Sequence, residues 1–257
     1  MSDKRTSKRR TVLLDSALIK ESVSRLTGWA LRLNDVRVDE MSRSRLERRV
    51  VADRLRRTGV PTGHVKGREL FASYLYSENV ILYNSDLLSE VSESEAQKYL
   101  FLAFVRAAQR QVYPEFFLST DALSREAILM GRHGGDVPVD ERVRRCGGAQ
   151  EKLQARMGFA EGHASVLYAA YAQREGLVVS LLEPSLEALL ALSEGADSRL
   201  SHYISGVMVV NEVFSRYPEM IDSLYSNPAL VEQVFGEGGL KVPTQERAIV
   251  DSARPAW

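Results

Sequence analysis

The chain has 257 residues, of which 44% are hydrophobic and 26% charged, so it holds enough apolar material for a substantial buried core. Its 34 lysines and arginines balance its 34 aspartates and glutamates, which excludes a global field that would steer the molecule toward a polyanion or a polycation. A single cysteine, Cys146, excludes an internal disulfide framework and a multi-cysteine zinc site, and it fits a reducing compartment.

The two ends of the sequence differ in composition from its middle. Residues 1–10 are basic and polar and lack the apolar run of a secretory signal, and no later stretch is apolar for long enough to span a bilayer. We therefore expect a cytoplasmic protein without a membrane span. We predict a disordered basic tail over residues 1–10, a single domain over residues 11–237 and an extended tail over residues 238–257.

The N-terminal third shows helical and strand patterns in turn. Apolar residues at helical spacing predict a helix over residues 12–33, and alternation over residues 35–39 predicts a half-buried strand. Residues 42–57 read as a very basic helix that contains seven arginines. Helical spacing spreads these arginines around the cylinder, and several can pair with Glu47 or Asp53. This favours a solvated face over a phosphate-binding surface.

The remaining elements follow from apolar runs and end signals. Residues 71–76 and 79–83 predict a β-hairpin, and Ser92 with Glu95 forms a capping box that opens a helix over residues 93–111. Pro114 ends that helix, and a second long helix spans residues 150–175. Shorter helices are predicted at residues 187–192, 201–216 and 218–225, whereas the pattern of residues 131–148 predicts neither order nor disorder. The predicted fold class is α+β and predominantly helical.

Several short motifs occur in the same order as in a known protein family. The segment LAFVRAAQRQ at residues 102–111 resembles the zinc helix of a bacterial family of gluzincin-type zinc metallopeptidases, which usually reads H-E-L-x-H-A-L-Q-D-Q. Residues 79–88 resemble the strand and loop before that helix, and Glu161-Gly162-His163-Ala164 resembles the E-G-x-A segment with the third zinc ligand. Residues 203–206, 227–228 and 232–233 are similar to the C-terminal helices of the family. The resemblance thus covers about residues 36–237.

This resemblance implies a zincin-like domain, in which a small β-sheet or hairpin packs on the two helices of the former zinc site. In zincins the strand before the zinc helix lies at a sheet edge and hydrogen-bonds extended substrate. The corresponding residues here are Asn79, Val80, Ile81, Leu82, Tyr83 and Asn84. We therefore predict them to be an edge strand that binds a partner segment by β-augmentation.

The sequence departs from the family pattern at the positions of the zinc ligands and the catalytic glutamate. Leu102, Ala103 and Arg106 stand where the family has its two histidine ligands and its catalytic glutamate, and among these positions only Glu161 remains. A single carboxylate lacks the nitrogen ligands that zinc sites need, and no two of the four histidines have H-x-x-x-H spacing. We thus expect no catalytic residue, no metal and no cofactor, and four vestigial positions.

Loss of zinc would leave Glu161 as a costly buried carboxylate unless it is paired. Our hypothesis is that Arg106 reaches Glu161, because an arginine and a carboxylate can form two parallel hydrogen bonds. The alternative is that Arg106 is a solvated residue near Glu95 or Arg110.

The function implied is that of a catalytically inactive pseudo-metallopeptidase that binds another protein or a peptide segment, as a regulator or scaffold, with homo- or hetero-oligomers open. The alternative is a nucleic-acid or polyanion binder that uses Lys4, Arg5, Lys8, Arg9 and Arg10 with residues 43–57. Zero net charge disfavours it. A third possibility is catalysis through Glu161 with Tyr168 or through Cys146, but no nucleophile stands beside a base.

Overall fold

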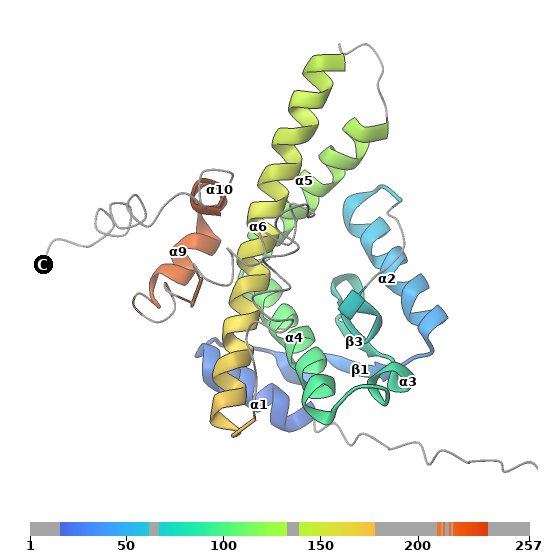
Figure 1. Ribbon diagram of the computed structural model, residues 1–257, viewed down its shortest axis with the longest axis vertical. Helices are drawn as coiled ribbons and strands as arrows, with labels where there is room; N and C mark the ends of the chain where they lie inside the picture. The colour runs from blue at the N-terminus through green and yellow to red at the C-terminus, as the bar shows by residue number, and fades with distance from the viewer. Residues whose placement is uncertain are drawn as a thin grey trace, which may run out of the picture. The chain divides into compact units, whose positions relative to one another are not determined.

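The computed structural model describes residues 16–61, 67–132, 139–177 and 218–235, together with positions 210, 211, 213 and 216. Within these residues the chain is mostly helical and holds one three-stranded sheet, so the predicted α+β class is confirmed (Figure 1). Contacts along the chain divide it into two compact units, one of residues 1–112 with 171–177 and one of residues 113–170 with 178–257. The single domain over residues 11–237 stays a prediction.

Where the structure describes it, the first unit combines the sheet with four helices and three short 3₁₀ turns. In chain order its elements are α1 (Ser16–Thr27), η1 (Leu33–Asp35), β1 (Arg37–Glu40), α2 (Arg43–Thr58), η2 (Gly67–Leu70), β2 (Ala72–Leu75), η3 (Tyr76–Glu78), β3 (Val80–Tyr83), α3 (Ser85–Leu88) and α4 (Glu93–Val112). The predicted first helix is shorter than expected, because Gly28 adopts φ 65 and its N–H bonds back to Ser24.

The sheet has the order β1-β3-β2. β2 and β3 form the predicted antiparallel hairpin, and Asn79 closes its turn in the left-handed conformation. β1 pairs with the other edge of β3 in parallel, from Arg37 opposite Val80 to Glu40 opposite Tyr83. β3 is therefore the central strand.

The prediction that residues 79–84 form an edge strand is wrong. Val80, Ile81 and Leu82 are all fully buried, and an unbroken apolar run of this kind is typical of a strand covered on both faces. Val80 and Leu82 pack with Leu46 and Val50 of α2. Ile81 faces the opposite side, where α4 packs against the sheet (Figure 1).

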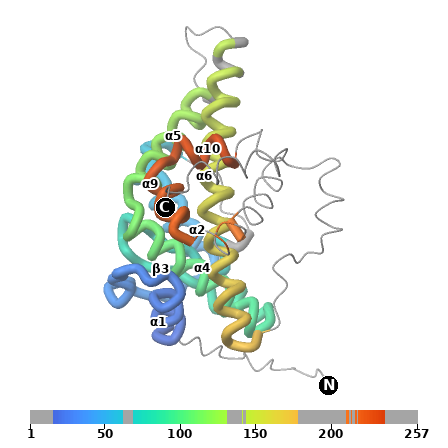
Figure 2. Tube along the Cα trace, turned by 90° about the vertical axis from the view of Figure 1, so that its left-hand side faces the viewer, coloured from blue at the N-terminus to red at the C-terminus, as the bar shows by residue number. Residues whose placement is uncertain are grey.

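Local signals explain how α4 begins and what packs beside it. The predicted capping box is present: the Glu95 N–H donates to Ser92 Oγ at 3.3 Å, and the Ser92 N–H donates to Glu95 Oε2 at 3.1 Å. α1 packs alongside α4, as Figure 2 shows. Gln111, near the end of α4, accepts from the N–H of Arg32 at 2.9 Å and so holds the chain that enters β1.

The second unit is helical where the structure describes it. Its helices are α5 (Pro114–Arg132), α6 (Val139–Arg174), α9 (Met220–Ser226) and α10 (Pro228–Phe235), and the last residues of α6 belong to the first unit. α5 was not predicted, because Pro114 also occupies the first position of a new helix, where its missing N–H costs nothing. The predicted helix at 187–192 and most of that at 201–216 lie outside the described residues.

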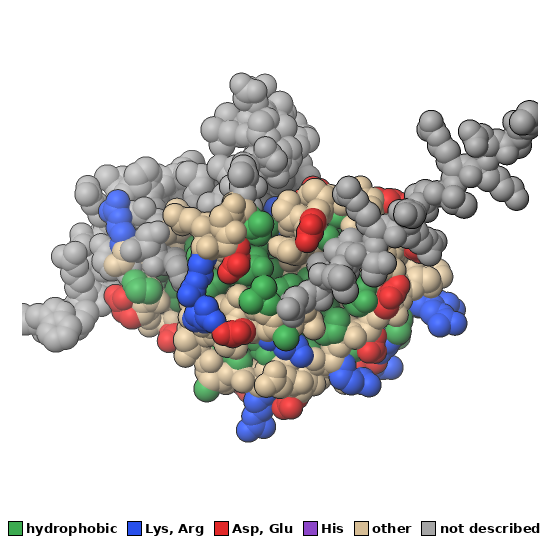
Figure 3. Space-filling view, turned by 90° about the horizontal axis from the view of Figure 1, so that it is seen from below, with side chains coloured by type: hydrophobic (Ala, Val, Ile, Leu, Met, Phe, Trp, Pro, Cys, Tyr) green, Lys and Arg blue, Asp and Glu red, His purple; other side chains and the backbone are tan. Residues whose placement is uncertain are grey.

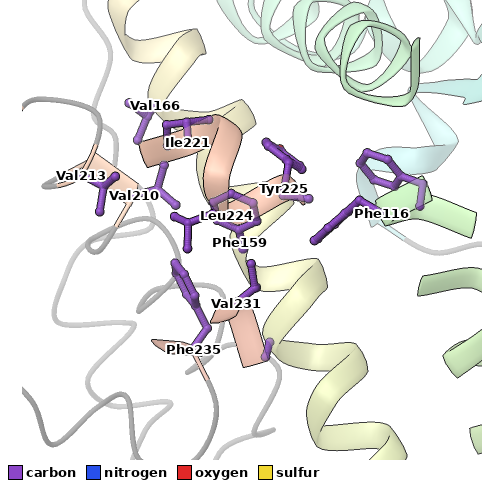
Figure 4. Close-up of a cluster of buried hydrophobic side chains, with 13 residues drawn as sticks. Phe116, Phe159, Val166, Val210, Val213, Ile221, Leu224, Tyr225, Val231 and Phe235 are labelled. Atoms are coloured by element: carbon purple, nitrogen blue, oxygen red, sulfur yellow. The ribbon is translucent and has the colours of Figure 1, made fainter. Parts of the chain in front are cut away.

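Aromatic and aliphatic side chains build the core of the second unit. Figure 4 shows residues of α6, α9 and α10 converging around Phe159. The rings of Phe116 and Tyr225 approach to 5.0 Å between centroids, and those of Phe159 and Tyr225 to 4.6 Å. This cluster holds α9 and α10 against α6. None of the described helices in either unit is both long and apolar enough to cross a membrane.

Candidate functional site

The helix that resembles a zinc helix is α4, and two of the positions predicted to be vestigial lie in the core. Leu102 is 5% exposed and Ala103 is 2% exposed. Their neighbours on the helix, from Leu100 to Val105, are also buried, so this part of α4 is covered on all sides. Arg106 follows one turn later and is half-buried. Leu102 and Ala103 thus act as packing residues, with no atom that could ligate a metal.

Glu161 lies on α6 in a stretch where every side chain from Phe159 to Tyr168 is buried. Its backbone carbonyl accepts a hydrogen bond from Ser165 Oγ at 2.9 Å. Arg106 belongs to the first unit and Glu161 to the second, so their pairing stays a prediction.

The two polar residues that bound the predicted partner-binding strand have structural roles. Asn79 accepts from the Tyr74 hydroxyl at 3.0 Å and donates to the Asp35 carbonyl at 3.2 Å, which fastens the turn to β2 and to η1, just before β1. Asn84 accepts from the N–H of Leu87 at 3.1 Å and so caps α3. The backbone of β3 between them is hydrogen-bonded to a strand on each side. These residues therefore have no free strand edge for a partner.

His163 is buried beside α9. Its Nδ1 atom lies 3.1 Å from the Tyr225 hydroxyl oxygen, and its ring stacks near Phe159. Burial lowers the pKa of His163 to about 3, so the ring is neutral at physiological pH. His163 is therefore a packing residue in the core of the second unit. His64, His133 and His202 are not among the described residues.

An ion pair between α6 and α10 escaped the sequence reasoning. Arg156 donates through Nε to Glu232 Oε1 at 2.8 Å and through Nη1 to Ser119 Oγ at 2.8 Å. The guanidinium therefore joins α5, α6 and α10. The two residues of this pair are 76 positions apart, so no local sequence pattern could reveal the contact.

Asp53 of α2 is a second buried charged group with a structural task. Its carboxylate accepts from the N–H of Ser77 at 2.9 Å, from Ser77 Oγ at 2.7 Å and from Arg57 Nε at 2.9 Å. The sequence predicted pairing of Asp53 with an arginine of its own helix, which is present. The bonds to the hairpin turn were not predicted.

The arginines of α2 divide into two groups. Four of them are ion-paired. Arg49 and Arg56 both pair with Glu78, Arg54 pairs with Glu69, and Arg57 pairs with Asp53. Arg49 also faces Asp39. Hydrogen bonds from Arg49 and Arg56 lower the pKa of Glu78 below its usual range. Arg43, Arg45 and Arg48 are exposed and form no ion pair with a described residue.

Among the residues that the structure describes, no three histidines, cysteines, aspartates or glutamates are grouped so that they could hold a metal ion. Cys146 is half-buried, and its Sγ atom lies 3.8 Å from the Ala127 carbonyl oxygen.

Comparison of the chain with models of protein families, with curated proteins and with solved structures found no match. Membership of the zincin-like family therefore remains a prediction from the motifs.

Proposed function

We propose that this chain is a catalytically inactive, zincin-like protein that acts by binding another protein. The observation that carries the proposal is the burial of Leu102 and Ala103 in the core of the first unit. In an active zincin these two positions on the zinc helix carry the first ligand and the general base.

The side chains at the vestigial positions oppose metal binding. Leucine and alanine offer no lone pair to a metal, and their burial favours apolar packing at these positions. An arginine at the third position carries a permanent positive charge, which repels a divalent cation. Glu161 alone would supply one ligand where a zinc site needs at least three from the protein.

The partner does not bind along β3 in this proposal, because that strand is already paired on both edges. Within the sheet, only β1 and β2 have an outer edge. Three of the four residues of β1 are charged, and charged residues on a short edge strand disfavour pairing with another chain. The proposed interaction therefore does not rest on β-augmentation at the predicted strand.

The first test restores the missing groups. The triple substitution Leu102→His, Ala103→Glu and Arg106→His rebuilds the H-E-x-x-H pattern and keeps Glu161. We expect the wild-type protein to contain far less than one zinc ion per chain by elemental mass spectrometry, and the triple variant to bind about one. Bound zinc should also raise the thermal unfolding midpoint of the variant, because metal that binds only the folded state stabilises it.

The matched control carries the same three substitutions together with Glu161→Gln. We expect it to bind zinc at least tenfold more weakly, since it lacks the third ligand. A folded triple variant that binds no more zinc than this control would refute the zincin-like arrangement. Stoichiometric zinc and peptide hydrolysis in the wild-type protein would refute the loss of catalysis.

Binding to a partner needs its own measurement. The intact chain, used as bait in extract from its native cell, should retain a protein partner at a defined stoichiometry. Cross-linking followed by mass spectrometry would then locate the surface used. Cross-links from the partner to the backbone region of β3 would contradict our assignment of that strand to the core.

A further inference from the structure

We propose that the first half of α2 is a nucleic-acid-binding surface, on which Arg43, Arg45 and Arg48 contact backbone phosphates. This inference is independent of the proposed loss of zinc chemistry, because it concerns a different helix. It rests on the division of the α2 arginines into ion-paired and uncommitted groups.

The uncommitted arginines are close together along the helix. At about 100° per residue, Arg45 and Arg48 lie on neighbouring faces about 60° apart, and Arg43 lies about 140° from Arg48. Arg43, Arg45 and Arg48 lie within two turns of one helix, a length of about 7.5 Å. All three are exposed and form no ion pair with a described residue; Arg48 donates only to the backbone carbonyl of Ser44. The other four arginines of the helix, Arg49 and the three of its second half, are ion-paired to acidic residues.

Two acidic side chains near the start of α2 have partners of their own, while Glu47 leaves the stretch from Arg43 to Arg48 with a net charge of +2. Glu40 accepts a hydrogen bond from Ser85, and Asp39 faces Arg49. The first turn of α2 contains no acidic residue, and the Ser42 side chain at the N-cap forms no capping hydrogen bond. The positive end of the helix dipole therefore adds to the charge of the arginines.

The charge of the chain is unevenly distributed although its total is zero. Residues 1–60 contain sixteen lysines and arginines but only eight aspartates and glutamates. Figure 3 shows one face of the molecule, on which acidic and basic side chains are mixed around apolar ones. The N-terminal quarter is thus the part of the chain where a polyanion would find an excess of positive charge.

The composition of this surface favours nucleic acid over protein. Its exposed residues are Ser42, Arg43, Ser44, Arg45 and Arg48, so it offers no apolar side chain to bury. Protein–protein interfaces have an apolar core, whereas protein–nucleic acid interfaces are polar and strongly positive. Arginine also matches phosphate oxygens with two parallel hydrogen bonds.

The same surface is poorly suited to a membrane. An interfacial helix inserts its apolar face between lipids. The apolar residues Leu46 and Val50 of α2 are buried against the sheet.

The test measures binding of the full-length protein to fluorescently labelled single-stranded and duplex oligonucleotides by anisotropy at several salt concentrations. The test variant is Arg43→Gln with Arg45→Gln and Arg48→Gln. Its matched control is Arg125→Gln with Arg144→Gln and Arg174→Gln, three arginines that are also exposed and without an ion pair to described residues. Both variants lose the same charge, and thermal unfolding shows whether both keep the wild-type fold.

We expect the wild-type protein to bind, with an affinity that falls steeply as salt rises. The test variant should bind about tenfold more weakly at low salt. Because three phosphate contacts are lost, the slope of log K against log salt should become shallower by about 2 for single strands and by about 3 for duplexes. The control should stay within about twofold of wild type. Replacing the same three arginines by lysine should give an intermediate loss, since charge is kept but paired hydrogen bonds are not.

Four outcomes would overturn the proposal. The first is that the wild-type protein does not bind the oligonucleotides at low salt, and the second is that the test and control variants lose the same affinity. The third is that affinity falls only when Lys4, Arg5, Lys8, Arg9 and Arg10 are replaced. The fourth is that the protein binds phosphatidylserine vesicles or polyglutamate in preference to the oligonucleotides.

Discussion

The Nδ1 atom of His163 lies 3.1 Å from the Tyr225 hydroxyl oxygen, and both side chains are buried. The contact links the long helix α6 to α9 inside the aromatic cluster of the second unit. A neutral imidazole can make this hydrogen bond in the core, whereas an imidazolium there would be costly. The position of His163 therefore ties the stability of the second unit to pH.

We predict that the free energy of unfolding falls by about 2 kcal/mol between pH 7 and pH 5 because of His163. Burial lowers its folded-state pKa to about 3, while the pKa in the unfolded chain is near 6.5. Stability from this group is complete above pH 6.5 and is lost as pH falls toward 3, since the unfolded chain binds the proton first. Urea unfolding at each pH gives the measurement.

The control for this prediction is His163→Gln, which replaces the ring by an amide that does not titrate in this range. The variant will be less stable at pH 7, but its stability should depend less on pH than that of the wild type. The two slopes are compared, because every other titrating group is common to both proteins. Equal slopes would show that His163 is not the group responsible.

Arg156 and Lys152 provide a comparison between two cations of α6 that reach the same carboxylate. The Arg156 side chain is 11% exposed and bonds to both Glu232 and Ser119, whereas the Lys152 side chain is 55% exposed and its Nζ atom lies 3.6 Å from Glu232. We predict that Arg156→Ala lowers the free energy of unfolding by about 3 kcal/mol. Lys152→Ala should change it by less than about 1 kcal/mol. Similar losses would mean that burial does not decide the strength of these pairs.

Asp53 should contribute more to stability than an ordinary surface carboxylate. Asp53→Ala leaves the N–H and hydroxyl of Ser77 without their acceptor, and we expect a loss of about 2 to 4 kcal/mol in denaturant unfolding. Glu69→Ala removes the partner of Arg54 from a pair in which the Glu69 side chain is 42% exposed. That loss should be below about 1 kcal/mol. A smaller effect at Asp53 than at Glu69 would contradict its role as the anchor of the hairpin turn.

Gly147 and Gly148 lie inside α6, where glycine weakens a helix. A Cβ atom added at either position would meet no other atom within 4 Å. We therefore expect Gly147→Ala and Gly148→Ala each to raise the free energy of unfolding by about 0.5 to 1 kcal/mol.

The control for the glycine substitutions is Gly28→Ala. A Cβ there would also meet nothing within 4 Å, but Gly28 has φ 65, which alanine adopts with strain. This variant should be destabilised by about 1 kcal/mol. If all three substitutions destabilise the protein, then Gly147 and Gly148 are needed because another part of the chain packs closely against them.

The arrangement of the sheet shows where local patterns are insufficient. The alternation near residue 37 and the apolar run at Val80, Ile81 and Leu82 correctly predicted strands. The unbroken apolar run indicates a strand buried on both faces, whereas the resemblance to the zincin strand implied an edge strand. The parallel partner of β3 is β1, which lies about forty residues earlier, and such pairing depends on helices packing over both faces.

Whether a proline or glycine ends a helix depended on the residues around it. Pro114 was interpreted correctly as the end of α4, but it also begins α5. The glycines at 147 and 148 made the order of their segment unpredictable, yet α6 continues through them. Their local cost is small, so the remaining residues of a long helix offset it.

The sequence by itself determined the local features of this protein: the capping box at Ser92, the β2–β3 hairpin, the basic helix α2, and the absence of metal-binding side chains at Leu102 and Ala103. These depend on residues a few positions apart or on side-chain chemistry alone. Only the tertiary structure decided that β3 is central, that Arg156 holds Glu232, that His163 is neutral in a core, and which arginines of α2 are ion-paired. Each of these depends on burial or on partners distant in sequence, which local patterns do not encode.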